Sequence, residues 1–179
     1  MSKPTETLRA LTARGVTHVV GLPDSISGPL FDVVERHPAI RMVTVTREGE
    51  AFAIATGLWM GGASPLVVIQ NTGLLESGDA IRGTALRVSA PIPILVTGRG
   101  YTKMRAAGID PAEPLSRELL ARMDVDSTAL LTERTLDAWG IPYRSCEGDH
   151  DPAEAVYDTI GDAREREQPV ALVMARSLT

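Results

Sequence analysis

Two kinds of apolar pattern alternate along the chain. Apolar residues three and four positions apart are typical of helices that pack one face on a core, whereas short continuous apolar runs are typical of buried strands. The first pattern predicts helices at residues 5–14, 28–36, 48–60, 77–88, 130–139 and 152–166. The second predicts strands at residues 17–20, 42–45, 66–69, 92–96, 143–145 and 170–175. Residues 98–114 show neither pattern and are expected to be an irregular, functional loop.

Short apolar strands that alternate with helices predict an α/β fold. Right-handed crossovers place the helices on both faces of a parallel sheet, so we expect three α-β-α layers around a six-stranded, mostly parallel sheet of the flavodoxin-like, doubly wound kind. The length of 179 residues suits one domain over residues 1–179. In such sheets ligands bind beyond the carboxyl ends of the strands.

Composition narrows the choice of partners and compartment. A net charge of −5 and only 18 basic residues argue against a nucleic-acid-binding surface. The single cysteine, Cys146, cannot form an internal disulfide, and no signal peptide precedes the first helix, which favours a cytoplasmic protein. No apolar stretch reaches eighteen residues, so no membrane span is expected.

Polar and glycine residues follow the first four predicted strands. Those that could carry chemistry are Asp24, Ser25, Glu48, Glu50, Asn71, Thr72, Gly73 and Arg99. On spacing alone, caps and turns explain them: Asp and Ser cap helices, Glu suits a helix N-terminus, and Gly makes turns.

Three segments change this interpretation. Residues 47–57 read Arg-Glu-Gly-Glu-Ala-Phe-Ala-Ile-Ala-Thr-Gly, residues 21–25 read Gly-Leu-Pro-Asp-Ser, and residues 70–74 read Gln-Asn-Thr-Gly-Leu. Together and in this order, they resemble the pyrimidine-binding domain of thiamine-diphosphate-dependent 2-oxo acid decarboxylases of the sulfopyruvate and phosphonopyruvate type. The resemblance extends over about residues 5–145 and implies that the chain is a flavodoxin-like thiamine-diphosphate pyrimidine-binding domain.

The resemblance also assigns roles to the residues after the strands. It implies that Glu48 is catalytic and that thiamine diphosphate is the cofactor. The expected cofactor-binding residues are Glu48, Asn71, Thr72 and Gly73, and the expected substrate-binding residues are Asp24, Ser25, Asn71 and Arg99.

A carboxylate beside the pyrimidine ring nitrogen shares a proton there, which lets the exocyclic nitrogen remove the thiazolium C2 proton. Glu48 fits the motif, and Glu50 is its rival. Two positions apart on a helix point about 200 degrees from each other, so only one of the two can face the site.

In this family a second domain holds magnesium and the diphosphate through a Gly-Asp-Gly segment and a downstream Asn. The chain has no Gly-Asp-Gly, and its only asparagine is Asn71. The resemblance therefore implies a separate beta subunit that carries Mg²⁺ and the diphosphate site, in a heterotetramer or a larger assembly. The substrate is expected to be a small anionic 2-oxo acid, gripped by Arg99 between two glycines.

The loop after Arg99 departs from the family pattern, because it has no histidine. Lys103 and Arg105 could join Arg99 in an anion pocket or simply be solvated. Two alternative functions stay open: a thiamine-diphosphate carboligase or acyl-transfer subunit of the same architecture, and a non-catalytic α/β binding domain.

Overall fold

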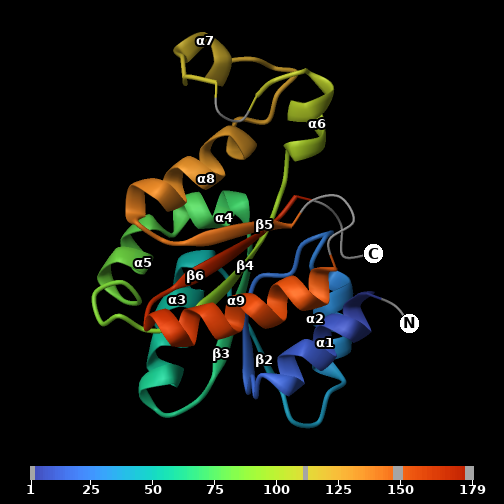
Figure 1. The fold of residues 1–179 in the computed structure, drawn as a ribbon, viewed down its shortest axis with the longest axis vertical. Helices are drawn as coiled ribbons and strands as arrows, with labels where there is room; N and C mark the ends of the chain where they lie inside the picture. Colours follow the sequence, from blue (N-terminus) through green and yellow to red (C-terminus); the bar gives the residue numbers. More distant parts are fainter. Residues whose placement is uncertain (1–2, 111–112, 147–150, 176–179) are drawn as a thin grey trace.

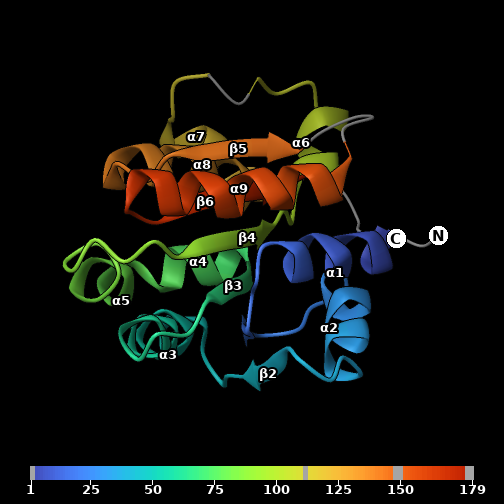
Figure 2. The same ribbon diagram turned by 60° about the horizontal axis from the view of Figure 1, so that its bottom comes forward.

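A single parallel sheet organises the structure. The computed structural model describes residues 3–110, 113–146 and 151–175. Its strands are β1 (His18–Gly21), β2 (Arg41–Thr44), β3 (Pro65–Gln70), β4 (Pro93–Thr97), β5 (Tyr143–Cys146) and β6 (Val170–Met174). They lie in the order β2-β1-β3-β4-β6-β5, and every neighbouring pair is parallel. Figure 2 shows β2, β3, β4, β6 and β5 one above another in this order. The six-stranded parallel sheet predicted from the sequence is confirmed.

Helices cover both faces of this sheet (Figure 1). One layer contains α1 (Lys3–Ala13), α2 (Gly28–Glu35) and α9 (Pro152–Arg166). The opposite layer contains α3 (Glu48–Met60), α4 (Asn71–Glu76), α5 (Gly78–Gly83) and α8 (Ser127–Trp139). Along each strand, alternate side chains enter the two cores: Val67 and Ile69 of β3 face α3, whereas Leu66 and Val68 face α1 and α9. No helix in the described part of the chain is long and apolar enough to cross a membrane.

Two predicted segments differ from the structure. The helix predicted at residues 77–88 is wrong in its bounds, because α4 begins directly after β3 and α5 ends at Gly83. The two helices are separated at Ser77, whose hydroxyl donates to the Gly73 carbonyl at 2.6 Å.

The expectation of an irregular stretch at residues 98–114 is also wrong in part. This stretch contains α6 (Tyr101–Ala106), and the short helix α7 (Arg117–Leu120) follows it. Tyr101 and Met104 of α6 are buried in the same core as α8. In Figure 1 the segment with α6 and α7 projects from the end of β4 beyond α8. Packing against a distant helix therefore orders part of a sequence that has no local pattern.

The strand order reverses between β1 and β3. The chain continues from β1 to β2 on one side and then crosses to β3 on the other. In an open α/β sheet the crevice beyond the carboxyl ends of strands at such a point is the usual ligand site. The ends of β1 and β3, with the α3 and α4 helices near them, are therefore the place to look for function.

Candidate active site

The Glu48 side chain lies against Gly73 at this reversal point. Glu48 is the first residue of α3, and Gly73 lies in the first turn of α4. A Cβ atom added to Gly73 would lie 2.2 Å from Cγ and 2.5 Å from Oε1 of Glu48, so glycine is the residue that leaves room for this side chain. Glu48 is partly buried, and its carboxylate makes no hydrogen bond or ion pair with the described residues. The site thus presents a carboxylate whose lone pairs are not used by residues 3–110, 113–146 or 151–175.

Glu50 points to a different part of the structure. Its Oε2 accepts from the backbone N–H groups of Thr46, at 3.0 Å, and Arg47, at 3.3 Å, and the Thr46 hydroxyl also donates to it. These hydrogen bonds from Thr46 are the main reason why the pKa of this exposed carboxyl lies below its ordinary value. Glu50 therefore caps the start of α3, and the two carboxylates diverge as helix geometry requires.

Asp24 is occupied by contacts within the protein. Oδ1 accepts from the backbone N–H groups of Ile26 and Ser27, both at 2.7 Å, and from the Ser27 hydroxyl at 3.0 Å. Oδ2 accepts from Nε2 of Gln70, at 3.3 Å, and from the hydroxyl of Thr97. Asp24 thus forms a capping turn before α2 and joins the ends of β1, β3 and β4. The neighbouring Ser25 is exposed.

Asn71 is a buried clamp. Its Nδ2 donates to the Arg99 carbonyl at 2.9 Å and to the Thr132 hydroxyl at 3.1 Å, and its Oδ1 accepts from the Arg99 N–H at 3.1 Å. Both donors of the amide are therefore used inside the protein. The Thr72 hydroxyl donates to Oε1 of Gln70 at 2.9 Å. Asn71 fixes the backbone at Arg99, whereas Thr72 belongs to the polar network around Asp24.

Arg99 forms an ion pair that the sequence did not reveal. Its Nε lies 2.9 Å from Oδ2 of Asp126, the N-cap residue of α8. Gly100, at φ +89°, permits this approach, because a Cβ there would lie 2.6 Å from Cβ of Asp126. Burial opposes ionisation of Asp126, but hydrogen bonds from Thr128 and Arg99 outweigh it and lower the pKa of this carboxyl. The Arg99 side chain remains 61% exposed, and its terminal nitrogens have no partner within the described residues.

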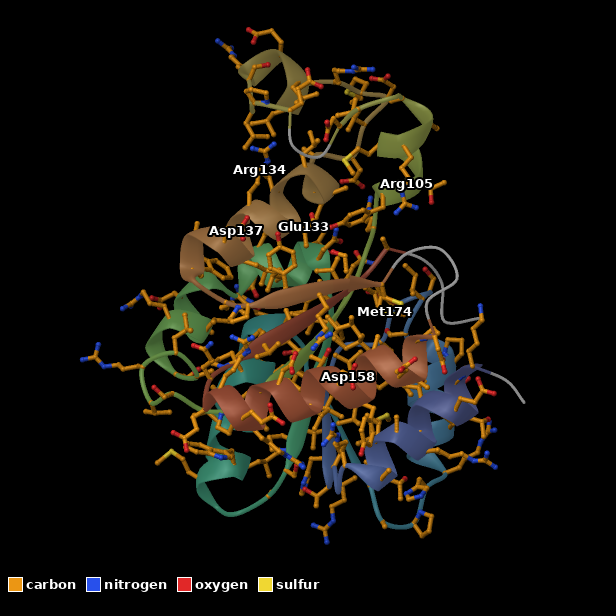
Figure 3. All side chains as sticks on the ribbon, viewed as in Figure 1. Arg105, Glu133, Arg134, Asp137, Asp158 and Met174 are labelled. Atoms are coloured by element: carbon orange, nitrogen blue, oxygen red, sulfur yellow. The ribbon has the colours of Figure 1, made fainter. Side chains whose placement is uncertain are left out.

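Further residues near the end of β4 include Gly98 and the two basic residues of the segment that follows it. Gly98 at the end of β4 donates its N–H to the carbonyl of Met174, labelled in Figure 3, at 2.8 Å. Lys103 and Arg105 lie on the exposed surface of α6, and Figure 3 shows Arg105 there, on the segment beyond β4. Among residues 3–110, 113–146 and 151–175, no three His, Cys, Asp or Glu side chains come together in a group that could hold a metal ion.

The predicted site residues thus fall into two groups. Glu48 and Gly73 meet at the reversal point, and Arg99 and Ser25 expose side chains at the same edge of the sheet. Asp24, Asn71 and Thr72 instead hold the strand ends together. Gln70 and Thr97 were missed, although a polar residue that closes an apolar strand is the signal by which they could have been found.

The chain is similar in sequence to a known protein family. Residues 5–115 match the model of the thiamine pyrophosphate enzyme, N-terminal TPP binding domain. A phosphonopyruvate decarboxylase of Streptomyces viridochromogenes is 40% identical over 90 residues, which cover 50% of this chain and 23% of that protein. The chain thus spans about a quarter of the length of this relative. The sulfopyruvate decarboxylase subunit alpha of Methanococcus maripaludis is 28% identical over 170 residues, or 93% of this chain and 90% of the relative.

Solved structures share the same fold. Benzoylformate decarboxylase from Polynucleobacter necessarius superposes with a TM-score of 0.70 at 19% identity, over 96% of this chain and 29% of that chain. At this identity the likeness concerns the fold alone. The family match covers more than half of the chain, including Glu48, Gly73 and Arg99. The chain therefore belongs to the thiamine pyrophosphate enzymes, as a member of the family formed by their N-terminal TPP-binding domain.

Proposed function

We propose that this chain is the pyrimidine-binding alpha subunit of a two-subunit, thiamine-diphosphate-dependent decarboxylase of a small acidic 2-oxo acid, of the sulfopyruvate or phosphonopyruvate type. The observation that carries the proposal is the Glu48 carboxylate, which lies against Gly73 with its lone pairs unused by the described residues. The family match supports thiamine diphosphate as the cofactor. The names of the relatives support decarboxylation of an acidic 2-oxo acid.

The surroundings of Glu48 fit an aminopyrimidine. A protonated ring nitrogen needs an acceptor, and a partly buried carboxylate with no competing donor supplies one. When bound, thiamine diphosphate supplies the electron sink for the pair that the departing carboxylate leaves on the carbonyl carbon. Glu48 holds a proton at the pyrimidine ring nitrogen, and Gly73 keeps the space in which the Glu48 side chain lies. Asn71 bonds to the Arg99 backbone after β4 and Thr72 to Gln70 of β3, and these bonds fix the start of α4 against the strand ends.

Arg99 is the proposed contact for the acidic group of the substrate. Asp126 occupies its Nε, which leaves the edge formed by the two terminal nitrogens for a second oxyanion. Ser25 offers an exposed hydroxyl at the same edge of the sheet. Asp24, whose two oxygens already accept hydrogen bonds, acts in this proposal by holding the turn that presents Ser25.

The diphosphate and Mg²⁺ are assigned in this proposal to a separate beta subunit. The chain contains no Gly-Asp-Gly segment and only one asparagine, Asn71, which is buried in the clamp described above. The likeness to a sulfopyruvate decarboxylase subunit alpha over 93% of this chain supports a two-subunit enzyme. A heterotetramer or a larger assembly of two-fold related pairs follows as the expected form.

The test begins with co-purification of a chain that carries Gly-Asp-Gly and a downstream Asn. The pair should release carbon dioxide and an aldehyde from sulfopyruvate or phosphonopyruvate only when thiamine diphosphate and Mg²⁺ are present. Glu48→Gln should lower kcat by about 10²-fold or more, the usual contribution of a proton-transfer group. Glu50→Gln is the control, because its amide oxygen can still accept from Thr46 and Arg47.

Three results would count against the proposal. Near-normal turnover by Glu48→Gln would remove Glu48 from its role. A longer hydroxyketone as the main product would indicate carboligation instead of simple decarboxylation. Turnover by the pair without thiamine diphosphate would remove the cofactor assignment altogether.

A further inference from the structure

The carboxylate of Glu76 holds the residues on both sides of Glu48. Its Oε2 accepts the backbone N–H of Gly49 at 3.1 Å, and its Oε1 forms an ion pair with Nη2 of Arg47. Glu76 is the last residue of α4, whereas Arg47 and Gly49 belong to the start of α3. The Glu76 side chain of α4 thus connects α4 to the first turn of α3, the helix that begins at Glu48.

Gly73 and Glu76 act on Glu48 from the same helix. They are three positions apart and so lie on one face of α4. Gly73 provides the space for the Glu48 side chain, and Glu76 holds the neighbouring backbone. The hydroxyl and the N–H of Ser77 both donate to the Gly73 carbonyl, at 2.6 and 3.0 Å, which holds α4 at this point. The short helix α4 therefore fixes both where the Glu48 backbone starts and where its side chain lies.

Stabilising α3 does not by itself account for Glu76. Glu50, a residue of α3 itself, accepts from the N–H groups of Thr46 and Arg47 just before the helix, whereas Glu76 accepts from the Gly49 N–H and belongs to another helix. The Arg47 side chain is 72% exposed and that of Glu76 is 36% exposed, and ion pairs exposed to this degree contribute little to folding stability. What Glu76 adds is a fixed position of α3 relative to α4.

We infer that Glu76 is a positioning residue for Glu48. It keeps the first turn of α3 seated on α4, so that the Glu48 carboxylate is held in the orientation required to contact the aminopyrimidine. This inference rests on the proposed role of Glu48. It assigns to Glu76 no contact with the cofactor or the substrate.

The test combines a readout that needs no cofactor with steady-state kinetics. In the full chain, Glu76→Ala should speed amide hydrogen exchange at Gly49 by about fivefold, the factor that corresponds to the loss of one helix cap. In the complex with the beta subunit, the same change should lower kcat about tenfold and leave KM within about twofold, because misplacement affects the reaction more than substrate binding. Glu76→Gln keeps an acceptor for Gly49 and should recover part of both effects.

Asp79→Asn is the matched control. It removes one negative charge and one exposed ion pair, with Arg82, from the neighbouring helix α5. Within the described residues, no hydrogen bond or ion pair joins Asp79 to the start of α3. It should change neither the exchange at Gly49 nor kcat. Thermal unfolding of each variant establishes that it folds.

The outcomes separate this inference from the proposed function. If Glu48→Gln is inactive while Glu76→Ala has normal kcat, the positioning role is overturned and the role of Glu48 stands, whatever the exchange rate at Gly49. If Glu48→Gln keeps its turnover, both fall. A loss of kcat in Glu76→Ala without faster exchange at Gly49 would also overturn the inference, because the effect would not pass through α3.

Discussion

The substitution Gly73→Ala places a methyl group where the Glu48 side chain now lies. The new Cβ would be 2.2 Å from Cγ and 2.4 Å from Cδ of Glu48. Carbon atoms in contact are about 3.7 Å apart, so one side must move by roughly 1.5 Å. The Glu48 side chain is partly exposed and can swing outward, whereas Ser77 holds the backbone of α4. We therefore expect the carboxylate to be displaced and the helix to stay.

Activity and stability should then change independently. A displacement of about 1 Å in a catalytic group can cost about 10²-fold in rate, so kcat should fall by about that factor. Alanine is favoured over glycine in a helix by up to about 1 kcal/mol, so the free energy of unfolding should stay the same or rise slightly. A substitution that removes activity while it keeps or improves stability would identify the gap at Gly73 as functional space.

Steady-state kinetics of the two-subunit complex and urea unfolding of the chain measure these two quantities. Gly83→Ala is the control, because an added Cβ there meets no atom within 4 Å. In the double variant Gly73→Ala/Glu48→Gln, the second change should add little, since the first has already displaced the carboxylate. Normal kcat in Gly73→Ala would refute the reasoning. A loss of more than about 2 kcal/mol in the free energy of unfolding would also refute it, because the added methyl group would then have displaced the backbone of α4 and not the Glu48 side chain.

Two further predictions concern Arg99 and Asp126. Arg99→Ala should raise KM for a phosphonate- or sulfonate-bearing 2-oxo acid about tenfold more than for pyruvate, because only the former loses a charged hydrogen bond to its second acidic group. An equal change of KM for both substrates would exclude the contact between Arg99 and that group. Burial opposes ionisation of Asp126, but hydrogen bonds from Thr128 and Arg99 outweigh this effect and lower the pKa of its carboxyl. The ionised carboxylate therefore adds to the free energy of unfolding at neutral pH, and this contribution is lost as the pH falls through the lowered pKa. In urea unfolding, Asp126→Asn should therefore be less stable than the wild type at about pH 7, and the difference should shrink as the pH falls below about 4, the ordinary pKa of an aspartate. A difference that does not depend on pH would contradict this.

The architecture could be predicted because its causes are local. The strands β3, β4 and β6 are short apolar runs, and the helices α1, α8 and α9 each bury one face, so neighbouring residues specify these elements. Helix α3 begins at Glu48 and ends at Met60, as the pattern predicted, and Asp151 caps α9 through a hydrogen bond from Ala153. A parallel sheet follows from this alternation, since few other topologies bury all of these faces.

Elements that depend on distant contacts could not be predicted. The helix predicted at residues 77–88 did not include α4, whose first residue, Asn71, bonds to Arg99 and Thr132, 28 and 61 positions away. Helix α6 forms where Tyr101 and Met104 reach a core built largely from other elements. Neither feature has a signature in the local order of apolar and polar residues.

Within the site, the sequence indicates which side chains lie at the carboxyl ends of the strands. It does not indicate which of them make no hydrogen bonds within the protein and can therefore bind a ligand. Asp24 accepts a hydrogen bond from a hydroxyl 73 positions away, and Asn71 donates hydrogen bonds to acceptors 28 and 61 positions away. Glu48, which follows a strand in the same way, lies against a glycine and accepts nothing from the described residues. Polar residues at strand ends thus have either a structural or a chemical role, and the number of hydrogen bonds that each makes within the protein distinguishes the two roles. By that count Asp24 and Asn71 stabilise the edge of the sheet, and Glu48 is the group that we propose to carry out the chemistry there.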